Sequence, residues 1–431
     1  MIMQTKKAIV NANVFDGNDM LGKKNVVFQN GKIVSLSTEL PANAEIIDGK
    51  DCTLLPGLID AHVHTSVEFL REALKFGITT ELEMMGGFTK KGRESQLKDI
   101  RDIADVRSAG MGLTAPGGHP DELIPKGDGI PDFVLKEMEK MSEEQKEAFI
   151  AAHEAQRQEE ESDMDVTTVE GAIDFVHKQV ENGADYIKIM IEDGKVMNAP
   201  GLPMIPPDVL KAAVDEAHQL DKIVIAHILT AEAAKTAIEV GVDGLAHLFI
   251  DRPEWTPELI RAIADKGIFV TPCLVLNSSI IGRSACDIAH DERVQPKLND
   301  DWKMTMCSCF NTFPSGKMED NFNNVKDLYE AGVDILAGTD VSVPMPHLGG
   351  LAHGVSIHHE MQLLVRSGLS PIDALKSATS VIAKRFSLSD RGQIAEGLRA
   401  DLVLVKGNPI KDISDTLSIV GIWKEGISYH N

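Results

Sequence analysis

Two histidines separated by a single residue, His62 and His64, end an apolar run in residues 55–66 (LPGLIDAHVHTS). Side chains at positions i and i+2 of a β-strand lie on the same face, so the two imidazoles are expected side by side. Imidazole is the side chain that most commonly binds metal ions in proteins. The pattern therefore favours a metal site, and the alternative is a pair of half-exposed surface histidines.

Four more polar residues lie within or directly after apolar runs: Lys188 in YIKIM, His227 in VIAHIL, His247 in GLAHLF and Asp340 in ILAGTD. Taken singly, the histidines could be satisfied interior side chains, and the aspartate could cap a helix. Taken together with His62 and His64, they form a set of nitrogen and oxygen donors suited to zinc or a similar divalent ion.

Lys188 is flanked by the apolar residues Ile187, Ile189 and Met190, which predict a buried position. An unpaired ammonium group in a protein interior is very costly, so this side chain needs a partner. One solution is a structural salt bridge to a carboxylate. The other is carboxylation of the amine by CO2, which gives an anionic ligand with two oxygens that can bridge two metal ions.

The elements that must position these residues recur along the chain as a helix-period stretch, a glycine and an apolar strand. In residues 66–77 (SVEFLREALKFG), Ser66 is a candidate N-cap and Gly77 a C-terminal stop before the next strand. Eight strands are predicted, at residues 57–64, 78–85, 110–118, 184–191, 221–229, 242–249, 268–276 and 333–340. Strands that alternate with helices run parallel, so we predict an α/β fold with a (β/α)8 TIM barrel over residues 57–390. Catalytic groups of such barrels lie at the C-terminal strand ends, where the candidate ligands occur.

Other stretches depart from this unit. Residues 131–165 are charged and helix-forming, and they predict a helical insertion that is either simply solvated or acts as a lid. Residues 277–322 are polar and irregular, and they lengthen the connection after the seventh strand, over the active face. Residues 1–56 and 391–431 contain short β-runs, with Asn-Gly and Asp-Gly turns in the first of them, and predict one small β-sandwich domain beside the barrel.

Composition limits the kind of partner. The 431 residues include 43 Lys plus Arg and 66 Asp plus Glu, which gives a formal net charge of -23. This acidity argues against nucleic acid or an anionic membrane surface, because phosphate repels it. The N-terminus resembles a strand rather than a signal peptide, and no apolar run approaches the ~20 residues of a membrane span. We therefore expect a cytoplasmic protein.

The five cysteines are few and odd in number, so no disulfide framework is predicted and a reducing compartment is expected. Cys307 and Cys309 could chelate a metal ion. No second cysteine pair is present in the sequence to complete a structural zinc site with them.

The chain resembles the amidohydrolase superfamily over essentially its full length. The resemblance rests on the motifs LPGLIDAHVHTS, GADYIKIM, VIAHILT, GLAHLF, AGTDVSVP and the C-terminal pair SPIDALKSATSVIAKRF and DRGQIAEGLRADLVLVKGNP. Within the superfamily, the chain is similar to the imidazolonepropionase-related metal-dependent hydrolases, which include Xaa-Pro and Xaa-Lys/Arg dipeptidases.

The resemblance implies a centre of two divalent metal ions, with zinc favoured by the donor set. Carried over by motif, one ion is held by His62, His64 and Asp340, the other by His227 and His247, and both are bridged by a hydroxide and by carboxylated Lys188. Relatives that use one metal ion generally lack the lysine of the fourth strand as a ligand. Its presence here favours two-metal hydrolysis over deamination.

Roles in catalysis follow from the same resemblance. Asp340 is expected to accept the proton of the attacking hydroxide and to pass it to the leaving nitrogen. His119, in the segment APGGHP, could steady the substrate carbonyl or the oxyanion, with a purely structural role as the alternative. His353 could contact the substrate, whereas His358 and His359 open a helix and are expected either to support the residues of the site from behind or to be structural.

The sequence also departs from the family pattern after the fourth strand, where relatives have a Thr-Gly-Gly turn. Here Glu192 and Asp193 follow, and we interpret them as solvated loop charges, with recognition of a cationic substrate group as the alternative.

The predicted function is hydrolysis of an amide bond in a dipeptide or an N-acyl amino acid. The alternatives are hydrolytic opening of a cyclic amide or lactone, as in imidazolonepropionase, and a non-catalytic scaffold. We expect a small-molecule substrate and, because such barrels commonly self-associate, a homo-oligomer.

Overall fold

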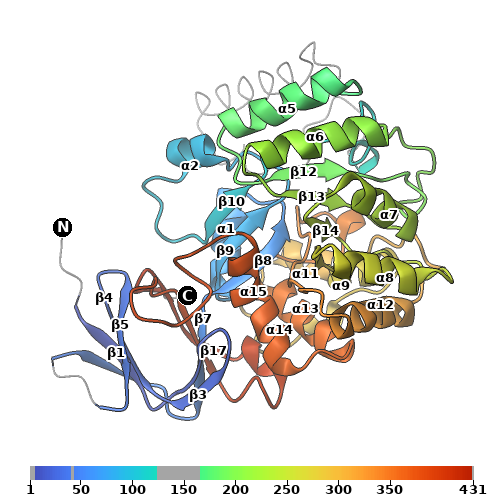
Figure 1. Ribbon diagram of the computed structural model, residues 1–431. Helices are drawn as coiled ribbons and strands as arrows, with labels where there is room; N and C mark the ends of the chain where they lie inside the picture. The colour runs from blue at the N-terminus through green and yellow to red at the C-terminus, as the bar shows by residue number, and fades with distance from the viewer. Residues whose placement is uncertain (1–4, 40–42, 124–165, 430–431) are drawn as a thin grey trace, which may run out of the picture.

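The computed structural model describes residues 5–39, 43–123 and 166–429. Strands and helices alternate through most of the chain, and the predicted α/β class is confirmed (Figure 1). The insertion predicted at residues 131–165 lies outside the described residues. Among the described helices, none combines the length and the apolar character that crossing a bilayer would require.

The strands that carry the candidate ligands, and the strands beside them, run parallel in two sheets. Their bounds are β8 (Leu58–Val63), β9 (Ile78–Glu83), β10 (Asp105–Ser108), β11 (Gly112–Leu113), β12 (Ile187–Met190), β13 (Val224–His227), β14 (Gly244–Ala246) and β15 (Phe269–Thr271). One sheet has the order β10-β9-β8 and the other the order β11-β12-β13-β14-β15. Residues 335–341 lie between the two sheets' outer strands, because isolated parallel bridges join Val270 of β15 to Ile335 and Val63 of β8 to Val341. The Asp340 segment is thereby bonded to both sheets.

The helix before β9 shows how the sequence sets the helix–strand unit. Helix α1 (Val67–Lys75) begins where the hydroxyl of Ser66 accepts a hydrogen bond from the Phe69 N–H, at 3.3 Å. Gly77 follows it with φ +78°, and a Cβ at this position would lie 2.9 Å from a Val403 methyl group. The left-handed conformation and the close approach both require glycine. The predicted helix and its two end signals are confirmed.

The other helices follow the parallel strands or lie between residues 355 and 385. They are α2 (Lys90–Gln96), α5 (Val169–Glu181), α6 (Pro207–Gln219), α7 (Ala231–Val240), α8 (Thr256–Asp265), α9 (Leu274–Ile280), α10 (Cys286–Ala289), α11 (Asp300–Met306), α12 (Met318–Glu330), α13 (Val355–Arg366), α14 (Pro371–Ser377) and α15 (Ser380–Arg385). Single 3-10 turns are η1 (Asp121–Leu123), η2 (Pro346–Leu348) and η3 (Ile413–Leu417). Helix α7 buries Ala231, Ala234, Ala237 and Ile238, a spacing of three to four residues that places them on one face against the core. In Figure 1, α5, α6, α7 and α8 lie outside β12, β13 and β14.

Three sequence predictions for this region are wrong in detail. The strand predicted at 268–276 ends at Thr271, because Cys273 adopts a left-handed conformation (φ +49°) and α9 begins directly after it. The strand predicted at 110–118 is reduced to Gly112–Leu113, and β10 before it was missed because its sequence, DVRS, lacks an apolar run. Residues 277–322, predicted to be irregular, contain α10 and α11.

The cysteine prediction also needs correction, because Cys286 and Cys307 form a disulfide. Their segments are brought together by a backbone hydrogen bond from the Ala285 N–H to the Met306 carbonyl oxygen, at 2.9 Å. Such a contact between α10 and α11 depends on the tertiary fold, and cysteine spacing alone does not reveal it.

The two ends of the chain pair with each other. The strands are β1 (Lys7–Val10), β2 (Asn13–Phe15), β3 (Met20–Lys23), β4 (Asn25–Gln29), β5 (Lys32–Ser37), β6 (Glu45–Asp48), β7 (Cys52–Pro56), β16 (Leu402–Lys406), β17 (Ile419–Lys424) and β18 (Ile427–Tyr429). They form sheets with the orders β5-β4-β1-β6 and β18-β17-β16-β7-β2-β3. One apolar cluster contains side chains from both sheets, and in it Phe28 meets Trp423 edge to face with ring centroids 6.1 Å apart. Residues from both termini therefore share a core.

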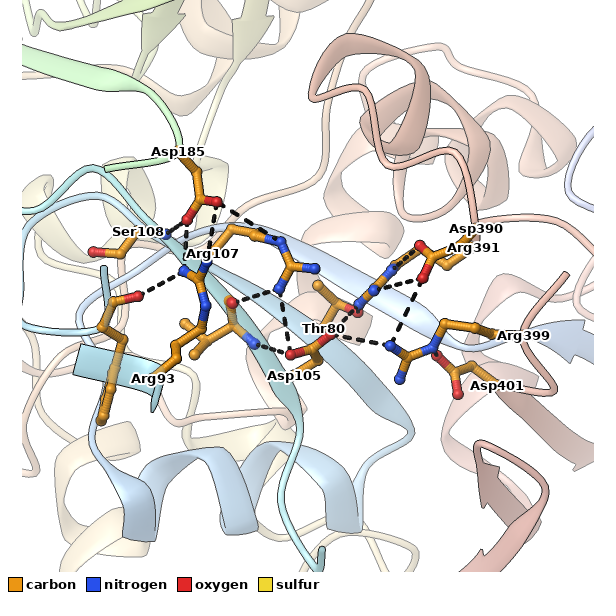
Figure 2. Close-up of polar contacts among 12 residues, drawn as sticks. Thr80, Arg93, Asp105, Arg107, Ser108, Asp185, Asp390, Arg391, Arg399 and Asp401 are labelled. Carbon is orange, nitrogen blue, oxygen red and sulfur yellow. Dashed lines mark hydrogen bonds and ion pairs between the residues drawn. The ribbon is translucent and has the colours of Figure 1, made fainter. Parts of the chain in front are cut away.

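A network of arginines and aspartates joins the parallel strands to the segment that leads into β16 (Figure 2). Arg391 and Arg399 both bind the Asp105 carboxylate of β10, and Arg391 also donates to the Thr80 hydroxyl of β9, at 3.1 Å. Burial would raise the pKa of Asp105, but the charges of Arg391 and its neighbours hold that pKa well below the usual range. The network fixes residues 391–399 against this end of the strands.

Candidate metal centre

The six residues predicted to bind metal come from five elements and converge in the structure. His62 lies in β8 and His64 directly after it, Lys188 lies in β12, His227 ends β13, His247 follows β14, and Asp340 lies in the 335–341 segment. Lys188 interacts electrostatically with Asp340 and with the histidines His62, His227 and His247. The C-terminal ends of neighbouring parallel strands thus bring them together, as the sequence predicts.

Three of these side chains meet at one oxygen atom. The Nε2 atoms of His62 and His64 lie 3.0 and 3.1 Å from Oδ1 of Asp340. By the geometric criterion for hydrogen bonds, this oxygen has no partner within the described residues. Ligand atoms bound about 2.0–2.2 Å from one ion are separated from each other by roughly 3–3.5 Å. The spacing suits two nitrogens and one oxygen around a common divalent ion.

The Asp340 carboxylate is held in place by its backbone. Asp340 has φ +60°, a left-handed conformation that aspartate tolerates better than most residues. Its N–H donates to the His62 carbonyl oxygen at 2.8 Å, and the neighbouring Thr339 hydroxyl donates to the buried carboxylate of Asp60 at 2.7 Å. Burial opposes ionisation, yet interactions with the neighbouring His62 and His247 side chains hold the pKa of Asp340 well below its usual range. The side chain is therefore an anionic donor.

In both His62 and His64, the ring nitrogen that points away from Asp340, Nδ1, has a contact of its own. Nδ1 of His64 donates to the Met85 carbonyl oxygen at 3.1 Å, so Nε2, which faces Asp340, is the nitrogen that can bind a metal ion once it has lost its proton. Nδ1 of His62 lies 3.9 Å from Sγ of Cys273. Burial lowers the pKa of His62 to about 4, so its imidazole is neutral near pH 7. A neutral imidazole is the form that binds a metal ion.

The other two histidines form the far side of the cluster. The His247 ring stacks on His62 with centroids 4.6 Å apart and meets the His227 ring at 4.8 Å. Burial holds the pKa of both His227 and His247 well below the usual range, so both are neutral. Nε2 of His227 has no hydrogen-bond partner in the part of the chain that the structure describes. An unpartnered buried nitrogen of this kind suits a metal ligand.

Lys188 lies at the centre of this group and is 1% exposed. Burial lowers the pKa of its amine to about 8, although the Asp340 carboxylate opposes the change. Among the residues described, no group accepts a hydrogen bond from Nζ. The salt bridge considered from the sequence is therefore not formed. Four histidines, a carboxylate and an unpartnered amine together fit a centre for divalent metal ions.

His119 lies beside the cluster, with its ring centroid 4.2 Å from that of His227. Its Nδ1 is 2.6 Å from Oε1 of Glu122, a residue of η1 that the sequence interpretation missed. The sequence signal for this contact was the spacing of three residues between His119 and Glu122, which brings side chains together in a helical turn. Because Glu122 engages Nδ1, Nε2 remains available to a ligand.

Glu192 is a second missed residue. It is 3% exposed, and its Oε2 lies 3.4 Å from Nε2 of His227, so its interpretation as a solvated loop charge is wrong. Burial raises the pKa of Glu192 to about 7, against the lowering effect of a hydrogen bond from the Gly194 N–H. Asp193, by contrast, pairs with the exposed Lys195, as expected of a loop charge. The sequence signal for a buried Glu192 beside the metal ligands was its position just after β12, four residues beyond Lys188.

His353 is placed differently from the ligand candidates. It is 1% exposed, and its Nε2 donates to the Ser342 carbonyl oxygen while its Nδ1 contacts Oε1 of Glu81, both at 3.0 Å. Its ring stacks on Phe69 with centroids 4.8 Å apart. Both nitrogens are thus engaged within the protein. His358 donates to the Phe76 carbonyl oxygen, a structural contact.

Comparison with known proteins places this site in a family. The model of the amidohydrolase family matches residues 53–428, so the chain belongs to the amidohydrolase family. It is 26% identical over 262 residues to an ochratoxinase of Aspergillus niger, an alignment that covers 58% of this chain and 47% of that protein. The chain therefore matches about half the length of this curated relative.

Solved structures share the fold over nearly the whole chain. A Xaa-Pro dipeptidase with bound methionine aligns with a TM-score of 0.71 and 22% identity, covering 99% of this chain and 100% of the other. The A. niger ochratoxinase aligns with a TM-score of 0.69 and 19% identity, covering 99% and 95%. These likenesses support an α/β fold of the TIM-barrel type.

Proposed function

We propose that this chain is a metal-dependent hydrolase that cleaves an amide C–N bond, in a dipeptide or an N-acyl amino acid, at a centre of two divalent ions. The observation that carries the proposal is the buried, unpartnered Nζ of Lys188 among four histidines and the Asp340 carboxylate. Membership of the amidohydrolase family supports the class of reaction. The shared fold with a Xaa-Pro dipeptidase makes dipeptides the first substrates to test.

Two groups of ligands account for two ions, and the donor set favours zinc. One ion would be held by His62, His64 and Asp340 and the second by His227 and His247, with carboxylated Lys188 as a ligand to both. Two observations support this assignment. Nε2 of His62 and Nε2 of His64 both lie close to Oδ1 of Asp340, and Nε2 of His227 has no hydrogen-bond partner among the described residues.

Carboxylation of Lys188 resolves the cost of its buried amine. With a pKa of about 8, a usable share of the amine is neutral near pH 7, and only the neutral amine adds to CO2. The nitrogen lone pair forms a bond to the carbon of CO2, and one nitrogen proton is released to water. The product is a carbamate anion with two oxygen donors.

The chain's own residues carry the remaining steps. Bound ions lower the pKa of water and polarise the substrate carbonyl. Asp340 then accepts a proton and delivers it to the leaving nitrogen, acting first as base and then as acid. His119, oriented by the contact of its Nδ1 with Glu122, donates from Nε2 when it is in the imidazolium form, to the oxygen that becomes negative as the carbonyl is attacked.

The finer description of the fold belongs to the same proposal. Residues 57–390 form a complete (β/α)8 barrel, which is supported by the bridges from residues 335–341 to β8 and β15. Residues 1–56 and 391–431 form a β-sandwich domain, supported by the core that their sheets share. A small-molecule substrate, a homo-oligomer and a cytoplasmic location remain predictions from the sequence.

Metal content per chain tests the proposal directly. The protein is purified with bicarbonate and without chelator, analysed for metal, and assayed on dipeptides, N-acyl amino acids, hydantoins and lactones. We expect close to two ions per chain and hydrolysis of the linear amides. A chelator should remove the bound metal and abolish the hydrolysis. Close to one ion, or activity on the cyclic compounds alone, would overturn the proposal in favour of ring opening. No metal after reconstitution would favour the scaffold alternative.

A further inference from the structure

A second cluster of metal-binding side chains lies on α10 and α11, and it shares no residue with the centre described above. Cys286, His290 and Cys307 each offer one donor atom, and these three atoms lie within 4.8 Å of one another. Cys286 begins α10 and His290 follows that helix, four residues later, so the two side chains lie on one face. Cys307 ends α11.

A backbone hydrogen bond beside the two cysteines joins the segments that carry them. The Ala285 N–H donates to the Met306 carbonyl oxygen at 2.9 Å, and the Cα atoms of Cys286 and Cys307 are 4.2 Å apart. In the structure these cysteines form a disulfide. A disulfide does not require a histidine beside it. Nevertheless, Nδ1 of His290 lies only 3.6 Å from Sγ of Cys286.

We infer that Cys286, Cys307 and His290 form a thiol-dependent binding site for a thiophilic divalent ion such as zinc, cobalt or cadmium. Two thiolates and one imidazole are the donors that structural and catalytic zinc sites use, and a fourth position is left for water. His290 and Cys307 are exposed and Cys286 is half-buried, so ions in solution reach the donors. Nδ1 of His290 also donates to the Cys286 carbonyl oxygen at 2.9 Å, and binding through this atom replaces that hydrogen bond.

The site exists only after the disulfide is reduced. A dithiol reductant breaks the S–S bond, transfers two electrons and two protons to the cysteines, and is itself oxidised to a disulfide. The metal ion then displaces the two thiol protons as it binds. Oxidation of the pair removes both sulfur ligands, so metal binding here and the disulfide exclude each other.

Cobalt absorption spectroscopy tests the inference without reference to hydrolysis. The full chain is reduced with a dithiol, the reductant is removed by anaerobic gel filtration, and Co²⁺ is added. A thiolate-to-cobalt charge-transfer band in the near ultraviolet is expected for the reduced chain and not for the oxidised chain. Cys307→Ser should abolish the band, and His290→Ala should weaken cobalt binding by roughly tenfold or more, since loss of even an outer-shell partner of a metal ligand costs that much.

Two matched control variants test whether the charge-transfer band comes from Cys286 and Cys307 and not from another cysteine. Cys309→Ser removes a neighbouring thiol, and Cys273→Ser removes the thiol near His62, and both should retain the band. The inference is overturned if the reduced chain lacks the band, if the band survives Cys307→Ser or oxidation, or if His290→Ala binds cobalt normally. Loss of the band in Cys273→Ser would move the thiolate ligand to the barrel centre. Failure of the hydrolase proposal would leave each of these outcomes unchanged.

Discussion

Nε2 of His62 lies 3.0 Å from Oδ1 of Asp340, and the other oxygen of the same carboxylate lies 3.6 Å from Nε2 of His247. One carboxylate thus faces histidines from both proposed metal positions. Such a side chain can bind an ion through one oxygen while the other oxygen remains able to carry a proton. The two functions proposed for Asp340 therefore fit its position.

Replacing Asp340 with asparagine separates these two functions. Asp340→Asn keeps the size of the side chain and one oxygen, but it removes the charge and the basic site. We expect kcat to fall by about 10²–10⁴-fold, the range for loss of a general acid–base group, while His62 and His64 retain much of the metal. Paired assays of amide hydrolysis and metal content check this. Full activity in the variant would exclude Asp340 as the proton carrier.

Replacing Lys188 should affect metal binding as well as rate. Lys188→Ala removes the amine that CO2 modifies, so activity should be abolished and metal content should fall. Short carboxylic acids added to the variant should restore part of both, because their two oxygens can take the place of the carbamate. Lys211→Ala, on the exposed surface of α6, is the matched control and should behave as the unmodified chain. Normal metal loading in Lys188→Ala would rule out Lys188 as a ligand.

His119 should matter for rate and not for metal content. His119→Ala is expected to lower kcat by about 10²–10³-fold, the cost of removing one donor to a developing oxyanion. Glu122→Gln keeps a partner for Nδ1 without the charge, so it should cause a smaller loss. Steady-state kinetics with metal analysis measure both effects. If His119→Ala lost metal, His119 would be a ligand rather than a donor to the substrate.

The sequence predicted the parts of the structure that local chemistry determines. Ser66 and Gly77 mark the ends of α1 because a hydroxyl cap and a left-handed glycine act within a few residues. The convergence of His62, His64 and Asp340 was predictable because parallel strands end at the same edge of a sheet.

The features that the sequence did not reveal depend on contacts between distant segments. Glu192 resembles a loop charge until β12 and β13 place it beside His227. The Cys286–Cys307 disulfide requires α10 and α11 to pair across 21 residues. The early end of β15 coincides with Pro272 and the left-handed conformation of Cys273, and the proline was the available signal.

His353 should stabilise the segment that carries Asp340. His353→Phe keeps an aromatic ring against Phe69 but leaves the Ser342 carbonyl oxygen and Glu81 without their buried partner. Loss of two buried contacts should lower the free energy of unfolding by about 2–5 kcal/mol. Urea denaturation measures this, with the exposed His347→Ala as control. Unchanged stability together with a raised KM would instead support the predicted substrate contact of His353.

The acid stability of the chain should depend on Asp105. Its pKa is held below the usual range because the charges of Arg391, Arg107 and Arg399 outweigh the opposing effect of burial. The stabilisation is therefore complete above the unfolded pKa of about 3.9 and is lost as pH falls through the lower folded pKa. At pH 7, Asp105→Asn should lower the free energy of unfolding by about 1–3 kcal/mol, less than for a fully buried pair, because the side chain is 24% exposed.

Below pH ~4 the difference between Asp105→Asn and the unmodified chain should begin to shrink, because Asp105 of the unfolded chain then binds a proton while the folded carboxylate stays ionised down to its lower pKa. Denaturation curves measured at several pH values test this directly. Asp102→Asn is the matched control, since Asp102 pairs with Arg71 on the surface and its loss should cost less than about 1 kcal/mol at any pH. A difference for Asp105→Asn that stays constant or grows as pH falls would show that the ion pairs in Figure 2 do not stabilise the folded state.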